Sequence, residues 1–187
     1  MEKSEVPQTL KETISIIVIA VALALLLRNF VIEGRIIPSG SMLPTLQLQD
    51  RVMINRFIYY FKDPIRGDII ILDPPPALNR TDIFIKRVIG LPGETVEMKN
   101  NKVYINDQAL NEPYLAEPLN YTFGPVVVPQ DSLLVLGDNR NNSYDSHKWL
   151  EDENVWLTRD RVKGKAFMVY WPLNHFHLLG REVSFDS

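Results

Sequence analysis

The feature that most constrains this chain is a long apolar stretch near its N-terminus. Residues 13–27 carry no charge, and apolar residues on both sides extend the stretch toward the roughly 20 residues that cross a bilayer. We therefore predict a transmembrane anchor over residues 13–32, preceded by a short tail over residues 1–12. The remaining residues, 33–187, are enough for one ordinary domain.

Two other interpretations of the apolar stretch stay open. Ala22, Leu23 and Ala24 form the small-x-small pattern of a signal-peptide cleavage site, which fits a secretory signal that is removed. A buried core helix is the other interpretation. The stretch stays apolar through Leu27, beyond the cleavage pattern, and this favours the anchor. The charges on its two sides are too evenly balanced to fix its orientation.

The composition excludes several kinds of site. No cysteine is present, so disulfides, thiol catalysis and zinc-thiolate sites are excluded. The three histidines form no His-Glu-x-x-His pattern, and we predict neither a metal nor another cofactor. The net charge is -3 with no long basic run, which argues against a nucleic-acid partner.

Beyond the apolar stretch, the chain consists of short β-branched and aromatic runs separated by Pro, Gly, Asn and Asp. This pattern is typical of a mainly β domain. Asn100 and Asn101 tolerate positive φ and predict a tight hairpin turn. The proline-rich region of about 100–125 predicts a small β insertion outside the main sheet. We predict strands over residues 51–55, 68–72, 83–89, 95–99, 102–105, 132–136 and 165–170.

Residues 38–45 place two serines, Ser39 and Ser41, beside a glycine and two prolines. These are ordinary turn residues, so the segment alone predicts no more than a turn. A serine becomes a nucleophile when a neighbouring base accepts its proton. The chemistry therefore depends on what other segments bring to this loop.

Lys86 lies in an apolar run of strand composition, residues 82–89. Side chains alternate between the faces of a strand, so Phe84, Lys86 and Val88 share one face and Arg87 lies on the other. Apolar neighbours would desolvate the ammonium group and lower its pKa, which a lysine general base requires. An edge-strand lysine with its charged end in water is the alternative.

Residues 137–146 form a polar loop directly after an apolar strand. Its hydroxyl and carboxylate side chains are of the kinds that aim a lysine amine toward a serine. A merely solvated loop has the same composition, so this assignment depends on the other two segments.

Together, these segments resemble those of the bacterial type I signal peptidases, membrane-anchored Ser/Lys proteases that remove signal peptides from exported proteins. The resemblance covers nearly the whole chain. It rests on four blocks in the order that the family has them: PSGSMLPT at 38–45, RGD at 66–68, KRVIGLPG at 86–93 and GDNRNNSYDS at 137–146.

The resemblance implies an antiparallel β-sheet domain of the signal-peptidase type, with Ser41 as the nucleophile and Lys86 as the general base. It also implies that Ser39 and the N–H of Ser41 stabilise the oxyanion, and that Ser143 hydrogen-bonds the lysine amine. The other residues with implied roles are the supporting Asp138, Arg87 and Asp145 and the substrate-binding Met42, Asp82, Ile83, Phe84 and Ile85.

Two positions depart from the commonest family pattern. His147 stands where many members have an arginine that pairs with the aspartate matching Asp145, and Leu150 replaces a glycine. The histidine form resembles cyanobacterial and plastid members. The support that Asp145 receives here is therefore an open question.

The resemblance also implies partners and a location. The expected substrates are precursor proteins with signal peptides, cleaved at a bacterial plasma membrane or a thylakoid membrane by residues 33–187 on the extracytoplasmic side. We expect a monomer in contact with the lipid bilayer, and an aromatic cluster over residues 57–61 at the membrane interface or in the core. The alternatives are a membrane-tethered β domain that binds without cleaving, and a Ser/Lys protease that cuts itself or a regulator.

Overall fold

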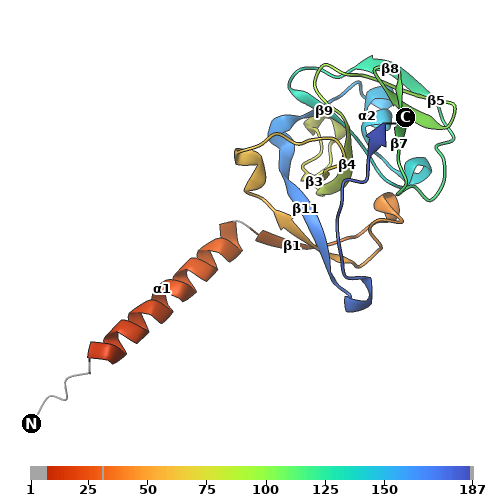
Figure 1. The fold of residues 1–187 in the computed structure, drawn as a ribbon. Helices are drawn as coiled ribbons and strands as arrows, with labels where there is room; N and C mark the ends of the chain where they lie inside the picture. Colours follow the sequence, from red (N-terminus) through yellow and green to blue (C-terminus); the bar gives the residue numbers. More distant parts are fainter. Residues whose placement is uncertain (1–7, 31, 186–187) are drawn as a thin grey trace, which may run out of the picture.

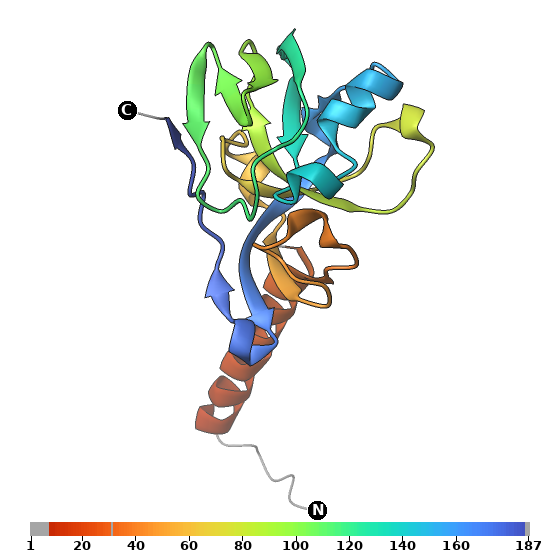
Figure 2. The same cartoon turned by 90° about the vertical axis from the view of Figure 1, so that its right-hand side faces the viewer.

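One long helix and a β body of two sheets make up the structure (Figure 1). The computed structural model describes residues 8–30 and 32–185. Helix α1 (Gln8–Phe30) projects away from the body and meets it at β1 (Ile32–Ile36). In the view turned by 90°, α1 again extends away from the lower end of the body (Figure 2).

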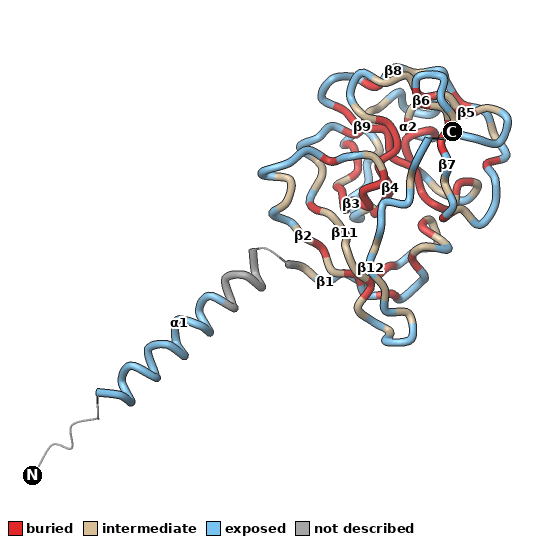
Figure 3. The backbone as a smooth tube through the Cα atoms, viewed as in Figure 1, coloured by how far each residue is buried: buried red, intermediate tan, exposed pale blue. Residues whose placement is uncertain are grey.

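The apolar stretch is helical, as predicted, and the helix begins at Gln8. Residues 1–7 of the predicted tail and residue 31 of the predicted anchor lie outside the described residues. Within the described part of the chain, no helix is both long and apolar enough to cross a membrane, so a membrane span is not confirmed. Over residues 8–23, where the side chains are described, α1 is exposed (Figure 3). Its exposed apolar side chains include Ile16 and Ile19.

The larger sheet has eight antiparallel strands and holds β4, the strand of Lys86, in its interior. Neighbouring strands follow the order β1, β2, β11, β3, β4, β9 and β10, and β12 pairs with β11. These strands are β2 (Arg51–Asn55), β11 (Val162–Trp171), β3 (Ile69–Leu72), β4 (Phe84–Gly90), β9 (Ser132–Leu136), β10 (Leu157–Thr158) and β12 (His177–Leu178).

The smaller sheet has five antiparallel strands in the order β13, β7, β6, β5 and β8. They are β13 (Ser184–Phe185), β7 (Gln108–Asn111), β6 (Lys102–Ile105), β5 (Thr95–Lys99) and β8 (Phe123–Val127). The described residues also form helix α2 (Ser146–Asp152) and the short 3-10 helices η1 (Gly40–Met42), η2 (Ile58–Tyr60), η3 (Pro76–Leu78), η4 (Arg140–Asn142), η5 (Arg159–Arg161) and η6 (Leu173–His175).

The mainly β prediction is confirmed, and every predicted strand has a counterpart in the two sheets. Asn100 and Asn101 have φ of 50° and 63° and join β5 to β6, as the predicted hairpin turn requires. The region of the predicted insertion, about residues 100–125, contains β6, β7 and the start of β8, which form the smaller sheet together with β5 and β13. The prolines after β6 indicated that this region departs from the main sheet. No strand was predicted over β7, because it has only four residues and no run of apolar ones.

The core lies on both faces of the larger sheet and between the two sheets. Strands β3 and β9 are buried along their whole length, which explains their continuous apolar sequences (Figure 3). Gly90, at the end of β4, sits where the sheets meet. A Cβ there would lie 2.7 Å from Val96 and 2.9 Å from Leu134, so glycine is needed for this close approach.

Candidate active site

Ser41 and Lys86 lie in hydrogen-bond contact although they are far apart in sequence. The Nζ of Lys86 donates to the Oγ of Ser41 at 2.8 Å. Ser41 belongs to η1, and Lys86 to β4 in the interior of the larger sheet. The segments of Ser41 and Lys86, which only the family resemblance connected in the sequence, are therefore adjacent in space.

Lys86 is buried, with 4% of its surface exposed. Strands β3 and β9 flank β4, and the ring of Phe84 lies 5.5 Å from the lysine Nζ. Burial lowers the pKa of Lys86 to about 8, and the nearby carboxylates of Asp145 and Asp138 oppose this shift only in part. The alternative of an edge-strand lysine with its amine in water is therefore wrong.

Ser39 stands beside Ser41 without holding it firmly. Its Oγ lies 3.5 Å from the Oγ of Ser41, at the outer limit of a hydrogen bond. Ser39 is exposed, so its hydroxyl is free to turn toward a group bound above Ser41. This geometry fits a donor to the substrate better than a support for the serine.

Arg87 and Asp138 form the predicted charged pair, and both side chains are fully buried. The guanidinium donates from Nε and Nη2 to the two carboxylate oxygens at 2.8 and 2.7 Å. The Thr45 hydroxyl donates to the same carboxylate at 2.5 Å. The pair therefore ties the polar loop after β9 to the loop that carries Ser41.

Asn139 is a further support that the sequence analysis missed. Its backbone N–H donates to the carbonyl of Ser41, and its side-chain amide donates to the carbonyl of Gly40, both at 3.0 Å. These two bonds fix the backbone carbonyls on either side of the Ser41 Cα. The only signal in the sequence was the position of Asn139 next to Asp138 in the polar loop.

Ser143 lies at the site without the contact expected of it. Its Oγ is buried and has no hydrogen-bond partner among the described residues, so the structure does not contain the predicted bond to Lys86. A Cβ on Gly137 would lie 2.3 Å from the Ser143 Oγ and 2.4 Å from the Ser41 carbonyl oxygen. Gly137 therefore allows Ser143 and the loop that carries Ser41 to pack together.

Asp145 keeps a side-chain partner although no arginine stands at position 147. Its Oδ1 meets the Nδ1 of His147 at 2.6 Å, and its Oδ2 accepts the N–H of Gly137 at 2.8 Å. His147 is buried and stacks on the ring of Tyr121, with the centroids 4.3 Å apart. The histidine thus takes up the supporting position that the sequence left open.

The predicted substrate-binding residues lie at the start of β4 and in η1. Met42 and Ile85 are buried in one apolar cluster, whereas Asp82 and Ile83 are exposed just before the strand begins. Phe84 pairs with β3 through Leu72, but the pairing of β4 with β9 begins only at Arg87. On the β9 side, the first residues of β4 therefore face no strand in the described part of the chain.

The aromatic cluster over residues 57–61 is divided between core and surface. Tyr59 packs against the core and donates its hydroxyl to Asp68 at 3.0 Å. Tyr60 and Phe61 are 79% and 73% exposed. The core interpretation is therefore wrong for these two rings.

The described residues contain no grouping of His, Asp and Glu that could hold a metal ion. His175 instead contacts Asp50, with its Nδ1 2.9 Å from a carboxylate oxygen.

Comparison with known proteins connects this geometry to one family. A family model described as "Signal peptidase, peptidase S26" matches residues 10–171. A signal peptidase I of Leptolyngbya laminosa is 48% identical over 94% of this chain and 87% of its own. Signal peptidase I S of Bacillus subtilis is 42% identical over 84% of this chain and 87% of its own. The chloroplastic thylakoidal processing peptidase 1 of Arabidopsis thaliana is 38% identical over 82% of this chain and 46% of its own.

Proposed function

This chain belongs to the signal peptidase I family, peptidase S26, and we propose that Ser41 is its nucleophile and Lys86 its general base. The chain is a serine peptidase that cleaves signal peptides from precursor proteins. The 2.8 Å hydrogen bond between Lys86 Nζ and Ser41 Oγ, at a buried lysine, is the observation that carries the assignment of the two residues.

The reaction follows from this contact. The neutral amine of Lys86 accepts the hydroxyl proton of Ser41 while the serine oxygen attacks the scissile carbonyl. The resulting ammonium gives the proton to the leaving amine as the C–N bond breaks, which releases the mature protein. Water that loses a proton to the same amine then hydrolyses the ester, and the signal peptide leaves.

We expect kcat/KM to rise with pH through about 8 and then to level off. The base is the neutral form of Lys86, and burial lowers the pKa of this lysine to about 8. At pH 7, about a tenth of the lysine would be neutral. Initial rates of precursor cleavage between about pH 6 and 10 measure the profile, with the unfolding midpoint at each pH as the control. A flat profile would contradict a lysine base.

The substrate would bind as an added strand beside the first residues of β4. The edge of this strand on the β9 side is open before Arg87, and a peptide in extended conformation can pair with such an edge. Met42 and Ile85, buried in one cluster, would form an apolar wall that admits small side chains. Asp82 and Ile83 would lie at the exposed entrance of this groove.

Ser39 would donate its hydroxyl to the oxyanion, beside the backbone N–H of Ser41. Loss of one such donor typically lowers kcat by about 10²–10³-fold, and we expect this loss in Ser39→Ala with little change in KM. Ser39→Thr retains the hydroxyl and should keep much more activity. The assignment fails if Ser39→Ala and Ser39→Thr cleave a signal-peptide precursor at similar rates close to that of the unchanged protein.

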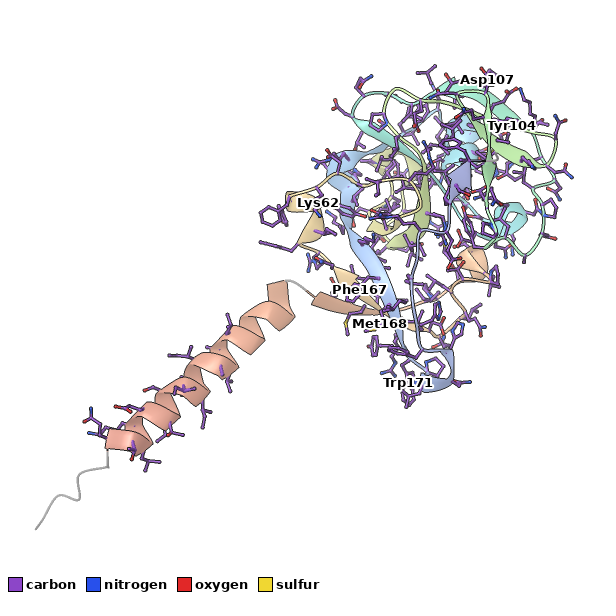
Figure 4. All side chains as sticks on the ribbon, in the orientation of Figure 1. Lys62, Tyr104, Asp107, Phe167, Met168 and Trp171 are labelled. Atoms are coloured by element: carbon purple, nitrogen blue, oxygen red, sulfur yellow. The ribbon has the colours of Figure 1, made fainter. Side chains whose placement is uncertain are left out.

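The family is associated with membranes in bacteria and in thylakoids, and we propose that α1 provides this association as a single-pass anchor. The apolar side chains of α1 that the structure describes, up to Leu23, are exposed, and they require a nonaqueous partner. Tryptophan is favoured at membrane interfaces, and Trp171, 48% exposed at the end of β11, lies at the lower end of the body (Figure 4). We further propose a monomer whose residues 33–187 lie on the extracytoplasmic side.

We expect the full chain to float with lipid vesicles and to resist extraction by alkaline carbonate. Replacing Ile16 and Ile19 together with aspartate places two charges in the apolar face and should release most of the protein. Ile36→Asp, a change at an exposed isoleucine of the body, is the matched control and should leave the protein bound. Complete extraction of the unchanged chain would refute the anchor.

A further inference from the structure

A segment that follows β11 crosses both sheets on the surface of the body. This segment, residues 177–185, is called the strap below. It begins with β12 paired to β11, continues with a bond from the N–H of Leu179 to the carbonyl of Phe167, and ends with β13 paired to β7. In Figure 1 the strap runs from the lower end of the body to the C-terminal label beside β7. The match to the family model ends at residue 171, before the strap begins.

The strap supplies hydrogen-bond acceptors to a buried residue behind the active site. Arg87 directs Nη1 to the carbonyls of Gly180 and Arg181, at 3.3 and 3.2 Å, and to the carbonyl of Gly67 at 3.0 Å. Its Nε and Nη2 are occupied by Asp138. The strap therefore holds one side of the guanidinium while the active-site loop holds the other.

Arg181 anchors the strap at this point. Its Nε donates at 2.9 Å to Asp68, which also accepts from Lys165 at 2.6 Å. Gly67 permits the close approach, because a Cβ there would lie 2.8 Å from both the Cβ and the carbonyl oxygen of Arg181. An ion pair and a glycine thus fix the carbonyls that face Arg87.

A continuous series of bonds leads from Arg87 to the nucleophile. Asp138 accepts from Arg87 and from Thr45. Asn139, the next residue, donates to the carbonyls of Gly40 and Ser41. The position of the Ser41 backbone therefore depends on the same loop that Arg87 holds.

We propose that the strap is a positioning element for the reaction, which fixes Arg87 and through it the loop that orients Ser41 toward Lys86. This inference rests on the proposed function of Ser41 and Lys86. A displacement of about 1 Å at a reacting group can lower the rate about 10²-fold, so a support of this kind acts on kcat. KM should change little, because the open edge at the start of β4 belongs to a segment that pairs with β3 and not with the strap.

Two shortened chains distinguish the effect of the Gly180 and Arg181 carbonyls from that of the rest of the strap. A chain ending at Leu179 keeps the bond to Phe167 and lacks Gly180 and Arg181, whereas a chain ending at Glu182 keeps both carbonyls and lacks β13. We expect the first to cleave a signal-peptide precursor with a kcat lowered about 10-fold to 100-fold and a KM within about twofold. We expect the second to retain most of its kcat.

Substitutions in the full-length chain test the same point without shortening it. Arg181→Ala removes the bond to Asp68 and should lower kcat severalfold, and Arg181→Lys should restore part of the loss. Arg159→Ala is the matched control, because Arg159 is similarly exposed, at 52% against 54%, and also forms an ion pair, with Asp63. It should leave kcat unchanged.

The proposal is overturned if the chain ending at Leu179 and Arg181→Ala both keep a normal kcat. It is also overturned if kcat falls only in proportion to the folded fraction, measured by circular dichroism at the assay temperature. Should the shortened chain fail to fold, Arg181→Ala with its lysine rescue decides the matter alone. Ser41→Ala in the full-length chain distinguishes failure of the proposed function from failure of the strap proposal. Cleavage that survives this change refutes Ser41 as the nucleophile, whatever the results for the strap.

Discussion

Replacing Lys86 with methionine is expected to lower kcat for precursor cleavage by about 10⁴-fold or more, as removal of a member of a catalytic serine-base pair does in other serine proteases. The amine is the only buried titratable group in contact with the Ser41 hydroxyl in the described site. Ser41→Ala should cause a loss of similar size. The double variant should be no worse than either single one, because both changes disable the same proton transfer.

The stability of Lys86→Met distinguishes a functional lysine from a structural one. Burial disfavours the charged form of Lys86, and methionine has a similar length without a charge. We therefore expect the unfolding midpoint of Lys86→Met at pH 7 to be equal to or higher than that of the unchanged protein. Lys163→Met, at an exposed lysine of β11 paired with Asp73, is the control for loss of a charge and should keep full activity.

Circular dichroism for the midpoints and a precursor assay for the rates are sufficient measurements. Cleavage by Lys86→Met at more than about a hundredth of the normal rate would reject the lysine as the base, even if Ser41→Ala is inactive. A large fall in stability together with the loss of rate would leave a structural role as the explanation. The expected combination, a stable and inactive protein, fits only a base.

The sequence was sufficient to predict what depends on local pattern and spacing. Alternation along one strand placed Lys86 and Arg87 on opposite faces, and in the structure one contacts Ser41 and the other Asp138. The two asparagines at 100 and 101 predicted their hairpin from the φ angles they tolerate. These features are set by neighbouring residues, which a single sequence contains.

Features that depend on contacts between distant segments could not be predicted in this way. Asn139 holds the Ser41 backbone through a bond that spans the chain from one loop to another. The strap pairs through strands of only two residues each, β12 and β13, which are too short to show the alternation of a strand. The sequence likewise gave no indication that Ser143 would lack a bond to Lys86, because side-chain direction at a loop is set by packing.

Breaking the buried pair of Arg87 and Asp138 is expected to have the largest effect on stability. Removing one partner leaves the other charge buried and unpaired, which typically costs about 3–5 kcal/mol. Arg87→Met leaves Asp138 with the Thr45 hydroxyl as its one remaining side-chain donor among the described contacts. For a chain of this size, such a loss lowers the unfolding midpoint by about 10 °C.

A double-mutant cycle shows whether this loss belongs to the pair. Asp138→Leu alone should be as harmful as Arg87→Met, whereas the double variant removes both charges and should recover part of the stability. Arg159→Met with its partner Asp63 provides the exposed control, and an exposed ion pair of this kind contributes less than about 1 kcal/mol. Additive losses in the buried pair would mean that each residue acts through its other contacts: Arg87 through the carbonyls of Gly67 and the strap, and Asp138 through Thr45. A coupling of several kcal/mol would instead identify the pair itself as the link between the strap and the loop that carries Ser41.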